Sequence, residues 1–258
     1  MALKEHANFH IHQTPGADIH TGMEEGSWIL KIPAGPKGSY RLAQLDDYSK
    51  QKRQAFPWSP PMALSLRARV FDSRIPGTWG FGLWNDPFSL SLGFGGGTRR
   101  FPALPNAAWF FFSSPQNYLS FRDDLPANGF LAQTFCAPQL PTPILALAAL
   151  GIPLLVWPWM GSKIRPFLRR MITEDSYALN IDVTQWHSYT LEWHQDRIIF
   201  KVDDQTLQTR ITPQGPLGLV IWIDNQHAAF YPNGKLAYGT LENFQPAWLE
   251  IESFMTRS

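Results

Sequence analysis

Three short clusters of polar residues follow apolar runs and contain the carboxyl groups best suited to acid–base chemistry. They are AQLDDY (43–48), WNDPF (84–88) and IWIDNQH (221–227). A carboxyl group held among aromatic rings is disfavoured in its charged form, so its pKa rises and it can donate a proton near neutral pH. We therefore predict Asp86 and Asp224 as a catalytic pair. The alternative is that both acids cap turns, because Asp-Pro and Asp-Asn are common loop sequences.

The same clusters supply groups that can orient a ligand. A binding site usually combines apolar walls with a few polar groups that fix the ligand's position. Asp46, Asn85, Asn225 and Gln226 carry carboxylate or amide groups at the predicted strand ends. We predict that these four residues contribute hydrogen bonds to a ligand.

Aromatic side chains surround these polar groups. In GTWGFGLWNDPF (77–88), strand alternation places Trp79 and Phe81 on one face and Trp84 on the other, and either face could line a cleft. The interleaved glycines allow a ligand or a neighbouring backbone to approach closely. We predict an aromatic cleft lined by these rings; the alternative is that the rings fill the protein core. The other rings predicted to line it are Trp109, Phe111 and Trp222.

Metal-binding signals are weak. His10 and His12 alternate on one predicted strand face, and imidazole is a common zinc ligand. No cysteine or acid joins them at a spacing typical of a metal site, so we predict no metal site there and interpret these residues as a His-rich N-terminal segment.

The elements that position these residues are predicted to be strands. The sequence contains 22 prolines and 19 glycines, which separate many short apolar runs. ALSLRARV (63–70) alternates apolar and polar residues, as a half-buried strand does. HSYTLEW (187–193) and RIIFKV (197–202) form a predicted hairpin. PLGLVIWID (216–224) is apolar on both faces and predicts a central strand, and WLEIESF (248–254) is predicted to close a sheet.

Residues 187–207 resemble the hairpin of family 16 glycoside hydrolases and related concanavalin A-like lectins and glucanases. His187, Tyr189, Glu192 and Trp193 match that family's pattern, and PGTWGFGLWN resembles its Trp-rich strand. The resemblance implies an all-β, concanavalin A-like jelly-roll β-sandwich, formed here by residues 1–258 as a single domain. It also implies that a structural calcium is possible, without singling out ligands for it; no other cofactor is predicted.

One departure from the family concerns its active-site strand, which carries E-x-D-x-x-E. The corresponding stretch here is NAAWFFFSSPQN (106–117), which contains no acid. Retaining hydrolysis needs two carboxyl groups roughly 5 Å apart. The resemblance therefore implies the fold without this mechanism.

A long uncharged segment interrupts the strand pattern. No charged residue occurs from Leu125 to Ser162, and PILALAALGIPLLVWPWM (143–160) is almost wholly apolar. Prolines within it disfavour one continuous spanning helix, and cations follow it directly. We predict an apolar and basic helical insertion over 138–172. It is interpreted as a buried cap or lid, as a peripheral membrane contact through 141–170, or, with least support, as a crossing segment.

Composition excludes some classes of function. The net charge of +1 argues against a nucleic-acid partner, because such proteins neutralise phosphates with many cations. One cysteine cannot form an internal disulfide, and the N-terminal residues do not resemble a signal peptide. We predict a cytoplasmic protein, with peripheral membrane association as an option. The sequence does not indicate an oligomeric state.

Three functions remain open. The first is a non-hydrolytic enzyme or binding protein that takes a lipid-like or terpenoid molecule into the aromatic cleft, with acid-assisted isomerisation or cyclisation as an option. The second is a lectin-like module that binds a glycan. The third is an atypical glycoside hydrolase whose acids come from elsewhere in the chain.

Overall fold

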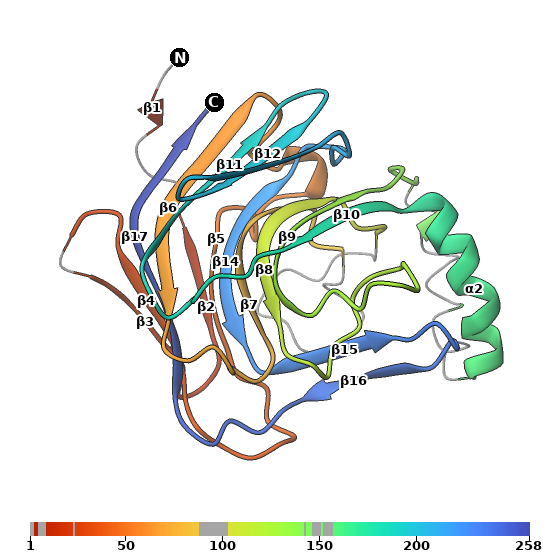
Figure 1. The fold of residues 1–258 in the computed structure, drawn as a ribbon, viewed down its shortest axis with the longest axis horizontal. Helices are drawn as coiled ribbons and strands as arrows, with labels where there is room; N and C mark the ends of the chain where they lie inside the picture. Colours follow the sequence, from red (N-terminus) through yellow and green to blue (C-terminus); the bar gives the residue numbers. More distant parts are fainter. Residues whose placement is uncertain are drawn as a thin grey trace.

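Two antiparallel sheets form the body of the protein (Figure 1). The computed structural model describes residues 3–4, 9–22, 24–87, 103–141, 143–145, 151 and 157–258. Sheet A has the strand order β13 (Gln205–Thr209), β12 (Ile198–Val202), β11 (His187–Trp193), β6 (Met62–Val70), β17 (Ala247–Arg257), β4 (Trp28–Ile32) and β3 (Asp18–Thr21), and β1 (Leu3–Lys4) pairs with β17. Sheet B has the order β10 (Thr173–Ala178), β9 (Gly129–Cys136), β8 (Ala107–Ser113), β7 (Thr78–Trp84), β14 (Gly218–Asp224), β5 (Leu42–Asp46) and β2 (His10–Gln13).

This arrangement confirms the predicted all-β jelly-roll sandwich. The β11–β12 hairpin closes through a hydrogen bond of 2.9 Å from the His194 amide to the Arg197 carbonyl, as the sequence predicts. β6 alternates buried and more exposed residues, and β14 is buried throughout between β7 and β5. One detail differs from the prediction. β17 does not close sheet A but lies inside it, between β6 and β4.

The main hydrophobic core fills the space between the sheets, and β7 contributes Trp79, Phe81 and Leu83 to it. Trp79 is 1% exposed and stacks on Phe130 with ring centroids 4.8 Å apart. Phe81 is fully buried and contacts Tyr189 of sheet A edge to face. The prediction that Trp79 and Phe81 line a cleft is therefore wrong, because this parity of β7 points into the sandwich.

The glycines of β7 accommodate neighbouring strands rather than a ligand. A Cβ atom on Gly80 would lie 2.4 Å from the Phe110 carbonyl oxygen and 3.0 Å from the Trp222 ring. A Cβ atom on Gly82 would lie 2.6 Å from both Cα and Cβ of Trp109. The sequence left open whether these glycines make room for a ligand or for a neighbouring backbone. In the structure they make room for the backbone of β8 and for the side chains of Trp109 and Trp222.

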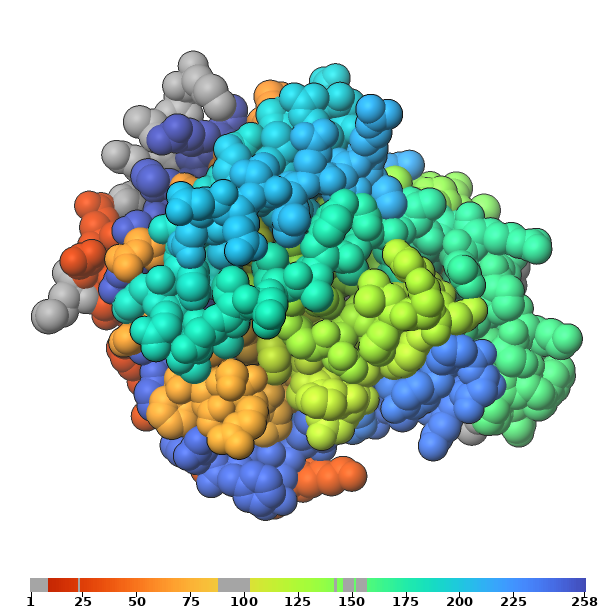
Figure 2. Space-filling view, in the orientation of Figure 1, coloured from red at the N-terminus to blue at the C-terminus, as the bar shows by residue number. Residues whose placement is uncertain are grey.

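The predicted insertion lies between the neighbouring strands β9 and β10. Its described part includes helix α2 (Pro158–Met171), which forms one edge of the molecule in Figures 1 and 2. Residues 146–150 and 152–156 of the predicted apolar segment lie outside the described residues. In the part of the chain that the structure describes, no helix combines the length and hydropathy needed to cross a membrane.

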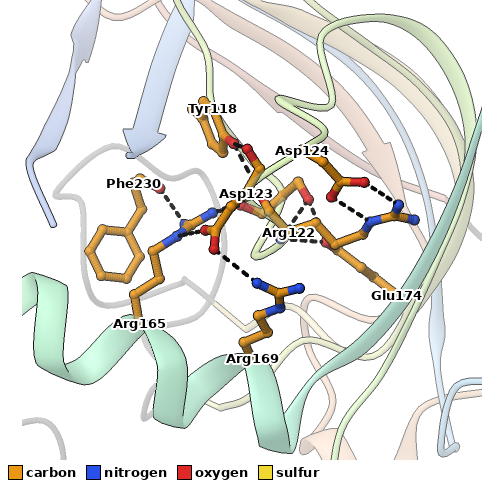
Figure 3. Close-up of polar contacts among 9 residues, drawn as sticks. Tyr118, Arg122, Asp123, Asp124, Arg165, Arg169, Glu174 and Phe230 are labelled. Atoms are coloured by element: carbon orange, nitrogen blue, oxygen red, sulfur yellow. Dashed lines mark hydrogen bonds and ion pairs between the residues drawn. The ribbon is translucent and has the colours of Figure 1, made fainter. Parts of the chain in front are cut away.

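A buried arginine attaches α2 to the rest of the protein (Figure 3). Arg165 is 2% exposed and donates hydrogen bonds to the carbonyl oxygens of Ser120, Arg122 and Phe230. Its Nε lies 3.1 Å from the carboxylate of Asp123. The guanidinium also packs over the ring of Phe230, at 5.5 Å from the centroid. Burying this charge is tolerated because acceptors surround it.

A second contact involves the hairpin of β15 (Gln226–Phe230) and β16 (Leu236–Thr240), which extends from β14 toward α2 (Figure 1). Gly161 of α2 lies against Gly234 in the turn of this hairpin. A Cβ atom on Gly161 would approach the Gly234 carbonyl oxygen to 2.1 Å. The two glycines thus allow the helix and hairpin backbones to touch.

We expect Gly80→Ala to lower the free energy of unfolding by about 3 kcal/mol. This is at the upper end of the destabilisation usual for overpacked substitutions, because the new methyl group meets backbone atoms that cannot move aside easily. Urea denaturation measures the change. Gly129→Ala is the control, since φ there is +82° but no atom lies within 4 Å of the added Cβ. Its loss should be about 1 kcal/mol. Equal losses in the two variants would contradict the close approach at Gly80.

We expect Arg165→Met to release α2 from the body, because the carbonyl oxygens of Ser120, Arg122 and Phe230 and the Asp123 carboxylate all lose their donor. Hydrogen exchange of the α2 amides should accelerate at least tenfold. Arg169→Met is the matched control: Arg169 bonds the same Asp123 carboxylate at 2.8 Å but is exposed, so its loss should change little. Similar exchange in both variants would show that Arg165 does not anchor the helix.

Candidate functional site

Four aromatic rings pack together on the face of sheet B that points away from the sandwich core. They are Trp84 of β7, Trp109 and Phe111 of β8 and Trp222 of β14, named here the aromatic quartet. Trp84 and Trp222 are parallel within 8°, with centroids 6.4 Å apart, and Trp109 stacks on Phe111 at 5.2 Å. Trp109 and Trp222 join the two pairs at 5.6 Å. The structure therefore brings together four of the predicted ligand-binding rings.

The strand register explains the quartet. Gly80 pairs with Trp222 and with Phe111, and Gly82 pairs with Trp109. Paired residues of neighbouring strands point to the same face. Because β7 has no side chain at these two positions, rings from both flanking strands can lie over it. The quartet thus depends on the same glycines that allow the strands to approach.

Further apolar residues surround the quartet and bury most of it. Trp109 is 9% exposed and Trp222 is 8% exposed, whereas Trp84 is half-buried. The Tyr48 hydroxyl accepts a hydrogen bond of 2.7 Å from Trp84 Nε1. Leu168 and Met171 of α2 pack against the same cluster. The described part of the insertion therefore contacts the apolar cluster on this face as well as connecting two strands of sheet B.

No carboxyl group comes from β8, which lies within the NAAWFFFSSPQN stretch. Its residues on the quartet face are Ala107, Trp109, Phe111 and Ser113. Three acids of other strands in sheet B also face this side. Glu174 lies on β10 at the edge of the sheet, whereas Asp46 pairs with Val220 and Asp224 pairs with Leu42. Four residue steps separate Asp46 from Asp224, or roughly 13 Å along the strands. That distance exceeds the roughly 5 Å that retaining hydrolysis needs.

Asp224 lies at the end of β14 and is connected to the quartet through Thr78. Trp222 Nε1 donates to Thr78 Oγ1 at 3.0 Å, and Thr78 Oγ1 donates to Asp224 Oδ1 at 2.8 Å. Burial raises the pKa of Asp224 to about 7, although the hydrogen bonds from Thr78, Gln226 and Tyr40 favour its charged form. The predicted acid near neutral pH is thus chemically reasonable at Asp224.

The prediction that Asp86 and Asp224 act as a pair is wrong. Asp224 pairs with Thr78 at the start of β7, whereas Asp86 follows Trp84 at the end of that strand. The six steps of β7 between Thr78 and Trp84 span roughly 20 Å. Asp86 is also 6% exposed, has a φ of 48°, and its carbonyl accepts a hydrogen bond from Arg53, so it belongs to a turn.

Two other predicted ligand-binding residues hold loops in place. Asn225 is fully buried, and its amide bonds the backbone of Ser39, Arg41 and Leu241. The Asn85 side chain donates to Leu104 O at 2.8 Å and accepts from Asn106 N at 3.0 Å. These side chains are therefore already used by the backbone.

Asp46 likewise caps the turn that follows β5. It accepts hydrogen bonds from Gln44, Tyr48 and Ser49. Burial opposes its ionisation, but hydrogen bonds from His12, Ser49 and Gln44 outweigh that effect, so the pKa of Asp46 is lowered. Gln226 is half-buried and its backbone amide donates to Asp224.

His12, which the sequence places among candidate metal ligands, contacts that same turn: its Nε2 lies 3.0 Å from Asp46 and 2.7 Å from Ser49. Over the described ranges, no three His, Cys, Asp or Glu side chains are grouped closely enough to hold a metal ion. The possible structural calcium stays a prediction.

A group of buried polar side chains beside the quartet, named here the polar notch, was not predicted. It consists of Gln133 on β9 with Ser176 and Glu174 on β10, and Gln133 and Ser176 are direct cross-strand partners. Gln133 is 1% exposed and its Oε1 accepts from Trp109 Nε1 at 3.2 Å. Gln133 Nε2, Ser176 Oγ and Glu174 Oε2 find no hydrogen-bond partner among the described residues. The only signal in the sequence is a lone glutamine inside the apolar strand GFLAQTFC.

Comparison with known proteins identifies similar folds. No protein-family model matches the chain, and no curated protein matches its sequence. Among solved structures, a legume lectin-like domain from Entamoeba histolytica aligns with a TM-score of 0.48 and 10% identity, over 97% of this chain and 90% of that one.

Two glucanase structures are also similar. A prokaryotic β-1,3-1,4-glucanase (lichenase) from a mouse hindgut metagenome aligns with a TM-score of 0.46 and 11% identity, over 93% of this chain and 82% of that one. For the Bacillus licheniformis β-glucanase the TM-score is 0.42 and the identity 11%, over 94% and 92% of the two chains. Similarity at this level concerns the arrangement of strands and not activity.

The raised pKa of Asp224 predicts a pH-dependent stability. Burial raises the pKa of this carboxyl group to about 7 in the folded protein, whereas an unperturbed aspartate has a pKa of 3.8. The stability contributed by the bound proton is therefore complete below about pH 4 and is lost as the pH rises through 7. Asp224→Asn should therefore make the free energy of unfolding, measured by urea denaturation, less dependent on pH between about pH 4 and pH 7, so that its slope against pH is smaller.

Asp196→Asn is the control for this measurement, because Asp196 is an exposed carboxylate in the β11–β12 turn. It should leave the slope unchanged. An Asp224→Asn slope equal to that of the wild type would show that Asp224 is ionised in the folded protein throughout this range.

Proposed function

We propose that the protein binds a small, largely apolar molecule on the aromatic quartet. The observation that carries this proposal is that four large rings lie together on the face of sheet B where β8 offers no acid. Aromatic rings recognise flat or gently curved apolar surfaces, such as those of terpenoids and other lipids. Leu168 and Met171 of α2, which pack against the wider apolar cluster containing the quartet, would contribute to the cover of such a site.

The polar notch adds a requirement on the ligand. Buried polar atoms without partners are costly, roughly 1–3 kcal/mol each, so they favour a ligand that bonds to them. Gln133 Nε2 is a donor, Glu174 Oε2 is an acceptor when ionised, and Ser176 Oγ can be either. A ligand with an apolar body and one hydroxyl group would satisfy both the quartet and the notch.

Acid-assisted isomerisation or cyclisation is the reaction we propose for this site if the bound molecule is an alkene. The neutral carboxyl group of Asp224 would protonate a double bond, the rings would stabilise the resulting cation through their π faces, and a proton from the ligand would return to the Asp224 carboxylate. The pKa of about 7 supports Asp224 as the proton donor. Asp86 is too remote to take part.

A glycan is the second candidate ligand. The juxtaposition of Trp109 with the polar notch favours it, since sugar rings stack on tryptophan and hydrogen-bond amides and carboxylates. Peripheral membrane contact through residues 141–170 and hydrolysis by acids elsewhere in the chain also remain predictions.

Titration with defined probes tests the proposal. Geranylgeraniol should bind and quench tryptophan fluorescence, and Trp109→Leu should weaken binding at least tenfold, which corresponds to about 1.4 kcal/mol of lost stacking. Trp186→Leu is the control, because Trp186 lies on sheet A, where it packs against Arg67 and Arg69. It should leave the affinity unchanged.

The same titration with the oligosaccharide laminarihexaose tests the glycan candidate. Binding of this oligosaccharide in place of geranylgeraniol, weakened by Trp109→Leu, would favour the glycan candidate. Release of reducing sugar that Asp224→Asn abolishes would establish hydrolysis instead. Binding of geranylgeraniol that is equally strong in Trp109→Leu would rule out the quartet as its site.

A further inference from the structure

The outer face of α2 exposes aromatic side chains that soluble proteins normally bury. All eleven tryptophans of the chain lie among the described residues, and only Trp157 and Trp159 are exposed, at 53% and 62%. Phe167, two turns further along α2, is 60% exposed. Large rings clustered on one exposed face mark an interaction surface rather than chance exposure.

Cations alternate with these rings on one stripe of the helix. Trp159, Lys163, Phe167 and Arg170 are spaced by four, four and three residues, so they lie along a single face. α2 contains no acid. Arg169, at the side of this stripe, is bonded to Asp123. We name Trp159, Lys163, Phe167 and Arg170 the outer stripe.

The opposite face of α2 is fixed, so the helix cannot rotate to bury the outer stripe. Gly161 touches the β15–β16 turn, Arg165 is enclosed by acceptors, and Leu168 packs toward the quartet. In Figure 2 the atoms of α2 form the right-hand edge of the molecule. The stripe is therefore presented outward by a rigid support.

We propose that the outer stripe docks on the surface of an anionic lipid bilayer, with the helix lying in the plane of the interface. Fourteen residues give a helix roughly 21 Å long, too short to span the hydrocarbon core but suited to lying on its surface. The rings enter the boundary between headgroups and acyl chains, and Lys163 and Arg170 meet lipid phosphates and carboxylates. The net charge of the whole chain is only +1, so this local charge, and not a general basic character, provides the complementarity.

A bilayer fits this surface better than a nucleic acid or a second copy of the chain. Nucleic acid is bound chiefly through many cations that neutralise phosphates, whereas the outer stripe has only Lys163 and Arg170, and these two charges also disfavour contact with the same stripe of a second copy. The inference does not depend on the ligand proposed for the quartet. Vesicle binding and geranylgeraniol binding are measured separately, so either can fail without the other.

Co-sedimentation of the full-length chain with vesicles tests the proposal. The wild type should bind vesicles that contain about 30% phosphatidylserine in phosphatidylcholine. It should bind vesicles of pure phosphatidylcholine at least tenfold more weakly, because the anionic lipid supplies the electrostatic attraction. Trp159→Ser with Phe167→Ser, and separately Lys163→Glu with Arg170→Glu, should each weaken binding at least tenfold. Raising the salt concentration should weaken wild-type binding as well.

Matched controls separate the stripe from general stickiness. Phe244→Ser removes a ring that is 86% exposed but lies outside α2, and Lys50→Glu with Arg210→Glu reverses two exposed cations elsewhere. Both controls should bind like the wild type. Because all substituted side chains are exposed, thermal unfolding should be nearly unchanged in every variant.

Three results would overturn the proposal. The first is absence of wild-type binding to the phosphatidylserine vesicles. The second is binding that the α2 variants retain. The third is a concentration-dependent dimer, seen by sedimentation velocity, that Trp159→Ser with Phe167→Ser abolishes, because the stripe would then be an interface between copies of the chain.

Discussion

The close approach of strands at β7 is the constraint on which the rest of the structure depends. One face of this strand carries Trp79, Phe81 and Leu83 and supplies large rings to the core between the sheets. The other face carries glycine at 80 and 82, so rings from β8 and β14 can lie across it. A single strand thus builds two aromatic layers, one inside the sandwich and one on its outer surface.

The second layer requires a cover, and the insertion between β9 and β10 provides part of it. Helix α2 packs apolar residues toward the quartet, but its position depends on a polar contact. Arg165 satisfies carbonyl groups from the 118–124 loop and from β15 that would otherwise lose their partners (Figure 3). The buried charge therefore joins three segments that are distant in the sequence, and it leaves the opposite face of the helix free to contact other molecules.

The described carboxyl groups on this face of sheet B lie away from the aromatic quartet's centre. Acids lie at the ends of strands, where Asp46 and Asp86 organise turns and Asp224 is buried beside Thr78. The centre of the face is occupied by rings, and Asp46 and Asp224 lie roughly 13 Å apart along the strands. At the centre of this face a ligand would contact apolar rings, and among the described residues it could form hydrogen bonds only with the polar notch around Gln133. This is the physical basis for preferring a ligand with an apolar body.

The sequence alone was enough to predict those strands whose apolar and polar residues follow a pattern within one short stretch. Alternation in 63–70, the paired runs at 187–202 and the doubly apolar run at 216–224 predict β6, the β11–β12 hairpin and the central strand β14, because side chains alternate along any strand. The sequence also predicts one aromatic cleft lined by six rings, of which the structure brings four together on the outer face of sheet B and places Trp79 and Phe81 in the core. Only the tertiary structure decided which parity of β7 faces the core, since both parities are apolar or glycine. It also separated Asp86 from Asp224: antiparallel neighbours end at opposite edges of a sheet, and strand pairing is not encoded in any short stretch of sequence.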